Sequence, residues 1–179
     1  MSGFYDVQGL QQIAVNLFYG WGYNFYRLEN QLRADDQLIR RKVGDILEQV
    51  TTTLSVAEST YRRLNLPAPS RERPYPDPKA VQAAQSLERL IGDVGVLKSR
   101  INALPVPESD LMTKRFRDEA DTLKALITCD ELLVGQSELL RTTLADLDSD
   151  RILMTLPAIN EGIQALQETL QRRKALLNP

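Results

Sequence analysis

The chain has 179 residues, of which 42% are hydrophobic and 26% are charged, and its formal net charge is −2. This length suits one domain with a substantial core, and the nearly balanced charge excludes a strong long-range attraction to nucleic acid or anionic lipid. Because the sequence has no histidine and only one cysteine, it also excludes imidazole-based catalysis, histidine-ligated zinc or di-iron sites and thiolate-rich metal centres.

The N-terminal segment is rich in aromatic residues and poor in charge. Eight of the eleven aromatic residues lie within the first 26 positions, and residues 7–26 carry no charged side chain. Apolar residues recur at helical spacing from Leu10 to Leu17, opposite glutamine and asparagine side chains, until Gly20 and Gly22 interrupt the pattern. We therefore predict an extra helix or arm over residues 1–23, joined to a helical bundle over residues 24–179.

Three interpretations of this arm stay open. In the first interpretation the arm completes the core, because aromatic side chains usually lie in the protein interior. In the second it forms an interface, where aromatic residues anchor contacts and charges are depleted. The third is a membrane surface, which suits Trp and Tyr but normally requires basic residues that this segment lacks. For the interface, the predicted contact residues are Phe18, Tyr19, Trp21, Tyr23, Phe25 and Tyr26.

Residues 24–64 carry apolar side chains at three- and four-residue steps. This heptad-like seam is typical of a long helix in a bundle or coiled coil. A helix over these residues would be roughly 60 Å long. Arg62 and Arg63 fall in its last turn, where cations interact favourably with the helix dipole.

A proline-rich connector over residues 65–79 ends this helix, and it holds five of the nine prolines. Proline fixes φ and has no amide hydrogen to donate, so we expect a stiff, extended loop. One Arg-x-x-Pro run within it, beginning at Arg71, offers a second interpretation as a segment read by a polyproline-binding groove. Asp77 is a good N-cap with Pro78 in the first helical position, so the second helix starts there and continues to about residue 103.

The third helix is expected to start after a cap at Ser109 and to reach about residue 147. Asp148, Ser149 and Asp150 then offer a break, and residues 149–155 form either a separate short turn or a kinked continuation. The last helix carries apolar residues from Ile159 to the C-terminus. Because short connections make neighbouring helices antiparallel, we predict an all-α fold, an elongated up-down-up-down bundle of three to four long helices.

Few residues form a pattern that is typical of catalysis or of metal or phosphate binding. Cys129 stands beside two carboxylates, which raise a thiol pKa, and is interpreted as structural. A run of alternating aspartates at 146, 148 and 150 resembles the start of a calcium loop, but the required glycine and the final glutamate are missing. No glycine-rich phosphate loop is present. We therefore expect no enzyme activity, no cofactor, no metal and no small-molecule substrate.

Basic residues gather at one end of the expected bundle. Most of them lie in last turns of helices, where the dipole explains them, and interleaved carboxylates offset the rest, so a salt-bridged end is one interpretation. The alternative is a site for an anionic surface, either membrane or nucleic acid. The residues in question are Lys98, Arg100, Lys114, Arg115, Arg117, Arg172, Arg173 and Lys174.

Taken together, these features predict a non-catalytic helical interaction protein, a subunit or an adaptor of a larger assembly. We expect a protein partner or self-association through the N-terminal arm, rather than nucleic acid or a membrane. The alternative function is a peripheral module that binds an anionic surface through its basic end and its aromatic residues. The lone cysteine and the lack of a basic, apolar leader predict a cytoplasmic location.

Overall fold

The structure is a computed structural model that describes residues 3–19, 32–71, 74–104 and 120–177. Within these ranges every regular element is a helix, and there is no strand. This confirms the predicted all-α class. The elements are η1 (Gly3–Tyr5), α1 (Val7–Tyr19), α2 (Leu32–Asn65), α3 (Pro78–Asn102), α5 (Ala120–Leu144), α6 (Ser149–Met154) and α7 (Leu156–Leu177).

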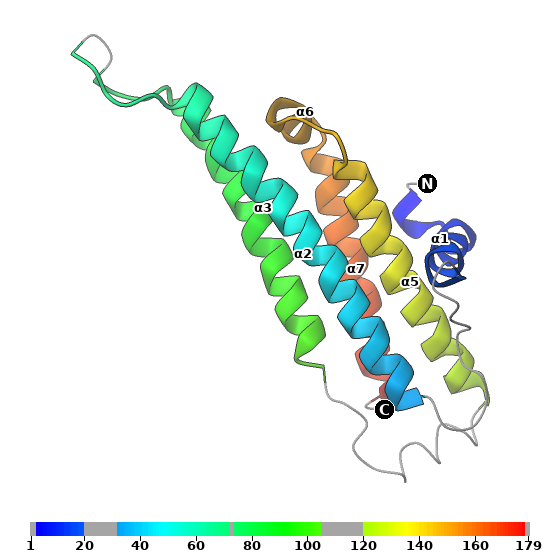
Figure 1. Cartoon of the computed structure of the whole chain (residues 1–179). Helices are drawn as coiled ribbons and strands as arrows, with labels where there is room; N and C mark the ends of the chain where they lie inside the picture. The colour runs from blue at the N-terminus through cyan, green and yellow to red at the C-terminus, as the bar shows by residue number, and fades with distance from the viewer. Residues whose placement is uncertain (1–2, 20–31, 72–73, 105–119, 178–179) are drawn as a thin grey trace.

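Four long helices pack side by side, and a short one lies outside them (Figure 1). α2 contacts α3 and α5, and α7 contacts α5 and α3. α2 and α3 are antiparallel, because Glu48 pairs with Lys98 while Arg62, further along α2, pairs with Glu88. α1 lies on α5, on the side away from α3.

The heptad-like seam of α2 faces the core. Its apolar residues from Ile39 to Leu54 are fully buried at four- and three-residue steps, and α3 supplies a matching row from Ala84 to Ile101. Steps of this size place side chains on one helix face, where they pack against the partner helix. The start of the predicted helix, over residues 24–31, lies outside the described residues.

The ends of the hairpin follow the predicted signals. α2 ends at Asn65, whose side-chain amide donates to the carbonyl oxygen of Tyr61 at 3.2 Å. Asp77 is extended, with φ −62° and ψ 122°, and its carboxylate accepts from the amide of Lys79 at 3.1 Å. Pro78 is the first residue of α3. Proline is tolerated there because an amide hydrogen in the first turn of a helix has no acceptor within the helix. The predicted cap is therefore confirmed.

Residues 149–154 form a separate short helix, α6, which settles the open choice in this region. Asp146 has a positive φ of 59°, and the carboxylate of Asp148 caps α6 by accepting from the amide of Arg151 at 2.9 Å. The aspartate run is thus a turn with a capping carboxylate. Pro157 is the second residue of α7, in the first turn, where proline is tolerated.

α5 is buried on every side over nearly two turns. All six residues at positions 132–137 are buried. α2 and α7 cover two sides of this helix, and α1 covers a third. A helix that is surrounded in this way needs no polar face, which explains why its apolar residues do not form a single stripe. Phe4, Ala14 and Phe18 of the N-terminal segment belong to the same hydrophobic core as the long helices.

Candidate interaction surfaces

A glycine brings α1 close to α5. Gly135 on α5 lies directly beneath Leu10 of α1, and a Cβ atom added there would overlap the Leu10 carbonyl oxygen and lie 2.9 Å from its carbonyl carbon. Only glycine leaves space for this approach of two backbones. Leu10, Ala14 and Phe18 follow one face of α1 at four-residue steps and are buried by the contact. The sequence alone gives no sign of this role for Gly135.

Phe4 fixes the other end of the segment. Its ring covers Gly162 of α7, where an added Cβ would lie 2.7 Å from the ring carbon Cζ. Its carbonyl oxygen accepts a hydrogen bond from Nε2 of the buried Gln136 at 3.1 Å. Gln11 of α1 donates to the carboxylate of Glu131 at 2.6 Å. These contacts hold η1 and α1 in a defined position on α5 and α7.

The outward face of α1 carries no charge, because no residue of this helix is charged. Val15 is 42% exposed and lies beside the exposed Gln12 and Asn16, and Val7, at the start of the helix, is 45% exposed. Nε2 of Gln12 donates to Oδ1 of Asn16 at 2.8 Å. An exposed surface of valines and amides without charges has the composition of an interface core.

The predicted partner-contact residues divide into two groups. Phe18 is 0% exposed and belongs to the core, so its side chain lies beneath α1 and not on its surface. Tyr19 is the last residue of α1, and its side chain falls outside the described part of the chain. The remaining four, Trp21, Tyr23, Phe25 and Tyr26, also lie outside the described residues.

Of the predicted basic residues that the structure describes, one is not available at the surface and another is in an ion pair. Lys98 pairs with Glu48 across the α2–α3 contact, and Arg173 is buried. The exposed members are Arg100, Arg172 and Lys174. Lys114, Arg115 and Arg117 lie outside the described residues.

Arg173 forms a buried ion pair that the sequence analysis missed. Its Nε donates to Oδ1 of Asp130 on α5 at 2.6 Å, and the two side chains are only 2% and 0% exposed. In the sequence, Arg173 is one of three consecutive basic residues, which read as ordinary cations at a helix end. The available signal is Asp130 itself, a carboxylate within a largely apolar stretch of α5, because a buried carboxylate requires a cationic or hydrogen-bonding partner.

Cys129 has the surroundings of a structural thiol. Its side chain is buried, and burial raises its pKa above the ordinary value, with a further increase from the neighbouring Asp130 charge. Arg172 and Arg173 act in the opposite direction and do not compensate. The thiolate that a nucleophile needs is therefore disfavoured. In the described ranges, no group of three or more acidic or cysteine side chains is placed to hold a metal ion.

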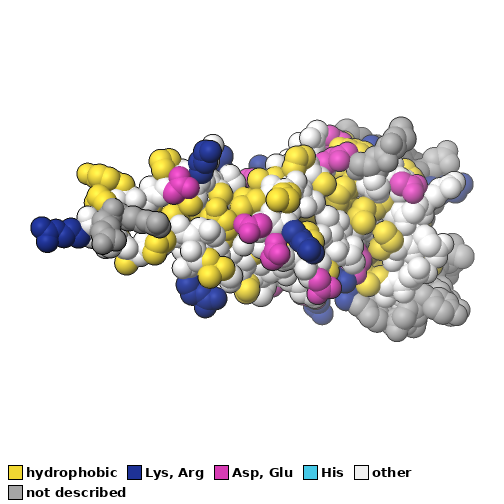
Figure 2. Space-filling model, turned by 90° about the horizontal axis from the view of Figure 1, so that it is seen from above, with side chains coloured by type: hydrophobic (Ala, Val, Ile, Leu, Met, Phe, Trp, Pro, Cys, Tyr) yellow, Lys and Arg dark blue, Asp and Glu magenta, His cyan; other side chains and the backbone are white. Residues whose placement is uncertain are grey.

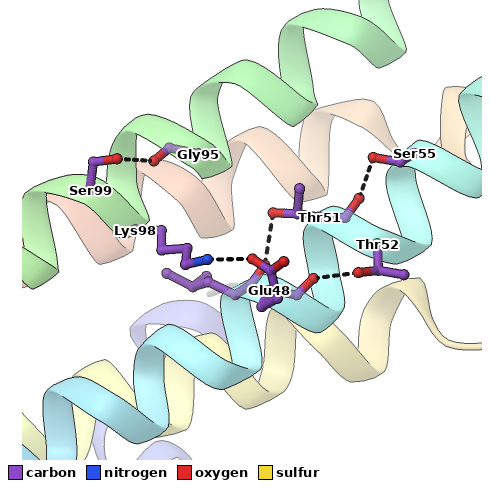
Figure 3. A network of polar contacts seen from close by, with 8 residues as sticks. Glu48, Thr51, Thr52, Ser55, Gly95, Lys98 and Ser99 are labelled. Carbon is purple, nitrogen blue, oxygen red and sulfur yellow. Dashed lines mark hydrogen bonds and ion pairs between the residues drawn. The ribbon is translucent and has the colours of Figure 1, made fainter.

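A hollow of about 430 Å³ lies on the outer face of α2, and most of the side chains around it are hydroxyls. The hydroxyls of Thr51, Thr52 and Ser55 each donate to a carbonyl oxygen one turn earlier in α2, at 2.8 to 2.9 Å (Figure 3). Glu48, at one end, is paired with Lys98. Since these donors bond to the helix itself, the hollow offers few groups aimed at a ligand.

Of the helices described, none is long and apolar enough to cross a bilayer. Comparisons with protein-family models, curated proteins and solved structures find no match to this chain.

Proposed function

We propose that the chain is a non-catalytic helical interaction protein, an adaptor or an assembly subunit, built as an elongated up-down-up-down bundle. It contacts a protein partner, or a second copy of itself, through its N-terminal segment. The observation that supports this proposal is the charge-free outward face of α1, where Val15 is 42% exposed beside the exposed Gln12 and Asn16.

The way α1 is held suits such a contact. Gly135, Gln136 and Gly162 fix η1 and α1 on the bundle, so the outward face keeps one geometry before a partner arrives. Binding a preorganised surface costs less conformational entropy than ordering a loose one. The aromatic residues at the end of α1 and directly after it in the sequence extend this contact, with Tyr19, Trp21, Tyr23, Phe25 and Tyr26 as the proposed anchors.

The test is site-specific photo-crosslinking in the cells that make the protein. A photoreactive residue replaces Asn16 on α1 or, as a control, the equally solvent-facing Asp93 on α3. We expect a discrete protein adduct from position 16 and none from position 93. Light scattering on the purified full chain then tells a second copy from a different partner.

Matched variants link the adduct to the surface. Val15→Lys places a charge on the α1 face, and Val96→Lys makes the same change at a 49% exposed position of α3. Val15→Lys should abolish the adduct and Val96→Lys should not. Both variants should keep the helicity of the parent chain. Trp21→Ala with Phe25→Ala should also weaken it. The proposal is overturned if no adduct forms at position 16 or if the adduct still forms in the Val15→Lys variant. Salt-sensitive binding to anionic vesicles without any adduct would favour the basic end instead.

A further inference from the structure

The connector between α2 and α3 is longer than the turn requires. α2 ends at Asn65 and α3 begins at Pro78, so residues 66–77 make a loop of twelve. Two antiparallel helices in contact need only about two to five residues to turn. Connections between helices in bundles usually have about two to eight residues, so this one is longer than is common. The extra length therefore requires an explanation other than chain reversal.

Proline makes this loop stiff. Between positions 74 and 78 every second residue is a proline, so Tyr75 and Asp77 each precede one. Proline fixes its own φ and moves the preceding residue out of the helical region. Asp77 has φ −62° and ψ 122°, close to the polyproline II values of about −75° and 145°. The backbone bends at Tyr75, so the loop consists of short extended pieces. A loop that only spans a gap does not need this stiffness.

Both ends of the loop are anchored, and its middle is exposed. Leu66 packs against the core, and Asp77 caps α3. Tyr75 is 86% exposed, and Leu64, in the last turn of α2, is 68% exposed. Figure 1 shows the loop projecting beyond the ends of the other helices. The ring of Tyr75 contributes nothing to the core, so it is accessible to another molecule.

Charge around the loop favours an acidic border on that molecule. Arg63, Arg71 and Lys79 are exposed at this end, where Figure 2 shows basic and hydrophobic side chains together. Of the acidic side chains that the structure describes here, Glu58 and Glu88 pair with Arg62, and Asp77 accepts the α3 amide. A lipid surface could bind the cations and the Tyr75 ring, but it does not recognise the shape of a proline-rich backbone. A protein groove can recognise that shape.

We propose that residues 66–71 and 74–77 form a recognition loop for a protein whose groove is lined by aromatic side chains and bordered by acidic ones. Tyr75, between Pro74 and Pro76, is the anchor of this contact. The loop is a second surface, separate from α1, and it rests on the proposed function only in that both make the chain an interaction protein. The fixed backbone lowers the entropy that the partner must overcome.

The probe is a panel of purified proline-reading domains with aromatic grooves, titrated into the isotope-labelled full chain and followed by NMR. We expect at least one domain to shift the signals of the loop and not those of α1. Tyr75→Ala should weaken this binding about tenfold or more, as loss of an aromatic anchor does. Pro74→Ala with Pro76→Ala should also weaken it, because the loop then loses its fixed shape.

The matched control is Met154→Ala, which removes an apolar side chain that is 81% exposed on α6. It should leave the binding unchanged, and all variants should unfold at the same urea concentration as the parent chain. The proposal is overturned if no domain of the panel binds, if binding survives Tyr75→Ala, or if vesicles of anionic lipid bind the loop in a Tyr75-dependent way. Val15→Lys should leave loop binding intact, so failure here and failure of the α1 contact are distinguishable.

Discussion

Gly135 and Gly162 allow α1 and η1 to pack closely against the bundle, which a larger residue at either position would prevent. Each lies beneath a residue of the N-terminal segment, and each leaves no room for a Cβ atom. Glycine inside a helix normally costs about 0.5–1 kcal/mol relative to alanine. Here the cost is offset by the buried contact that the missing side chain permits.

Gly135→Ala should therefore destabilise the protein, by about 1–3 kcal/mol. The added methyl group meets the backbone of Leu10, which cannot rotate away as a side chain can, so α1 must move off α5. This loss exceeds the gain of about 1 kcal/mol in helix propensity. Urea unfolding followed by circular dichroism measures the change in the free energy of unfolding.

Gly92→Ala is the control for this prediction. Gly92 lies within α3, it is exposed, and an added Cβ there meets nothing within 4 Å. Propensity alone should then act and stabilise the chain by about 0.5–1 kcal/mol. Equal effects of the two substitutions would show that α1 does not pack against Gly135.

Burial of Cys129 predicts a loss of stability at alkaline pH. Burial raises the pKa of the folded thiol above its unfolded value of about 8.5. The folded state therefore keeps its proton while the unfolded state releases one. The contribution is fully present below the unfolded pKa and is lost as pH rises towards the folded pKa. Cys129→Ala should thus lose less stability between about pH 8 and about pH 10 than the parent chain.

Urea unfolding at both pH values tests this prediction. The pKa of Tyr5 is also raised, by partial burial and by Glu168, but Tyr5 is present in both proteins and its contribution cancels. Cys129→Ala leaves a small cavity and lowers stability at every pH, so only the difference between the two pH values is informative. Identical pH dependence would mean that the thiol reaches solvent.

Single residues were predictable where the signal is local. Asp77 as a cap follows from its place before a proline and a helix, and the structure confirms it. Asp130 with Arg173 was not predictable, because the partners are 43 positions apart and only packing brings them together. The same holds for Gly135, whose role depends on a helix that lies 125 residues earlier, at Leu10.

Among the elements, α2 and α3 were the most predictable and α5 the least. The first two bury one regular stripe each, so their apolar spacing indicates both the helix and its inner face. α5 is covered by α1 as well as by α2 and α7, so its buried positions follow no single stripe. The aromatic arm was predicted as a segment, but periodicity contains no information on where such a segment docks.

A chain that begins at Asn24 should lose stability and part of its helicity. It lacks η1 and α1, so the face of α5 around Gly135 and Gln136 becomes exposed to water. Losing the buried Phe4, Leu10 and Phe18 side chains costs about 1.5–3 kcal/mol each on the transfer scale. Circular dichroism and the unfolding midpoint of the truncated and full chains measure the effect.

The mass of the truncated chain separates the remaining outcomes. If it is a stable monomer with the helicity of its remaining residues, α1 is a detachable element and not part of the core. If the full chain is an oligomer and the truncated one is a folded monomer, the same segment is the assembly element. A truncated chain that unfolds or aggregates agrees with the burial of Phe18 and Leu10.

At the scale of the whole molecule, shape follows from helix length. α2 has 34 residues, which at 1.5 Å each is about 51 Å, and the connector extends the rod further (Figure 1). Uninterrupted apolar seams predict an elongated bundle. They do not indicate that the α2–α3 hairpin extends beyond the ends of the other helices, as it does in Figure 1.

Small-angle X-ray scattering should therefore give a longest dimension well above that of a compact globule. A compact chain of this length has a radius of gyration of about 16 Å, which for a sphere corresponds to a diameter of about 41 Å, whereas α2 alone is about 51 Å long and the connector adds to it. Light scattering on the same sample must give the monomer mass, since an oligomer would also raise the value. Deleting residues 68–76 should shorten the longest dimension while leaving helicity unchanged, because residues 68–71 and 74–76 lie outside the helices. A monomer with a longest dimension of about 41 Å would mean that the hairpin folds back on the bundle, which would remove the exposed position of Tyr75.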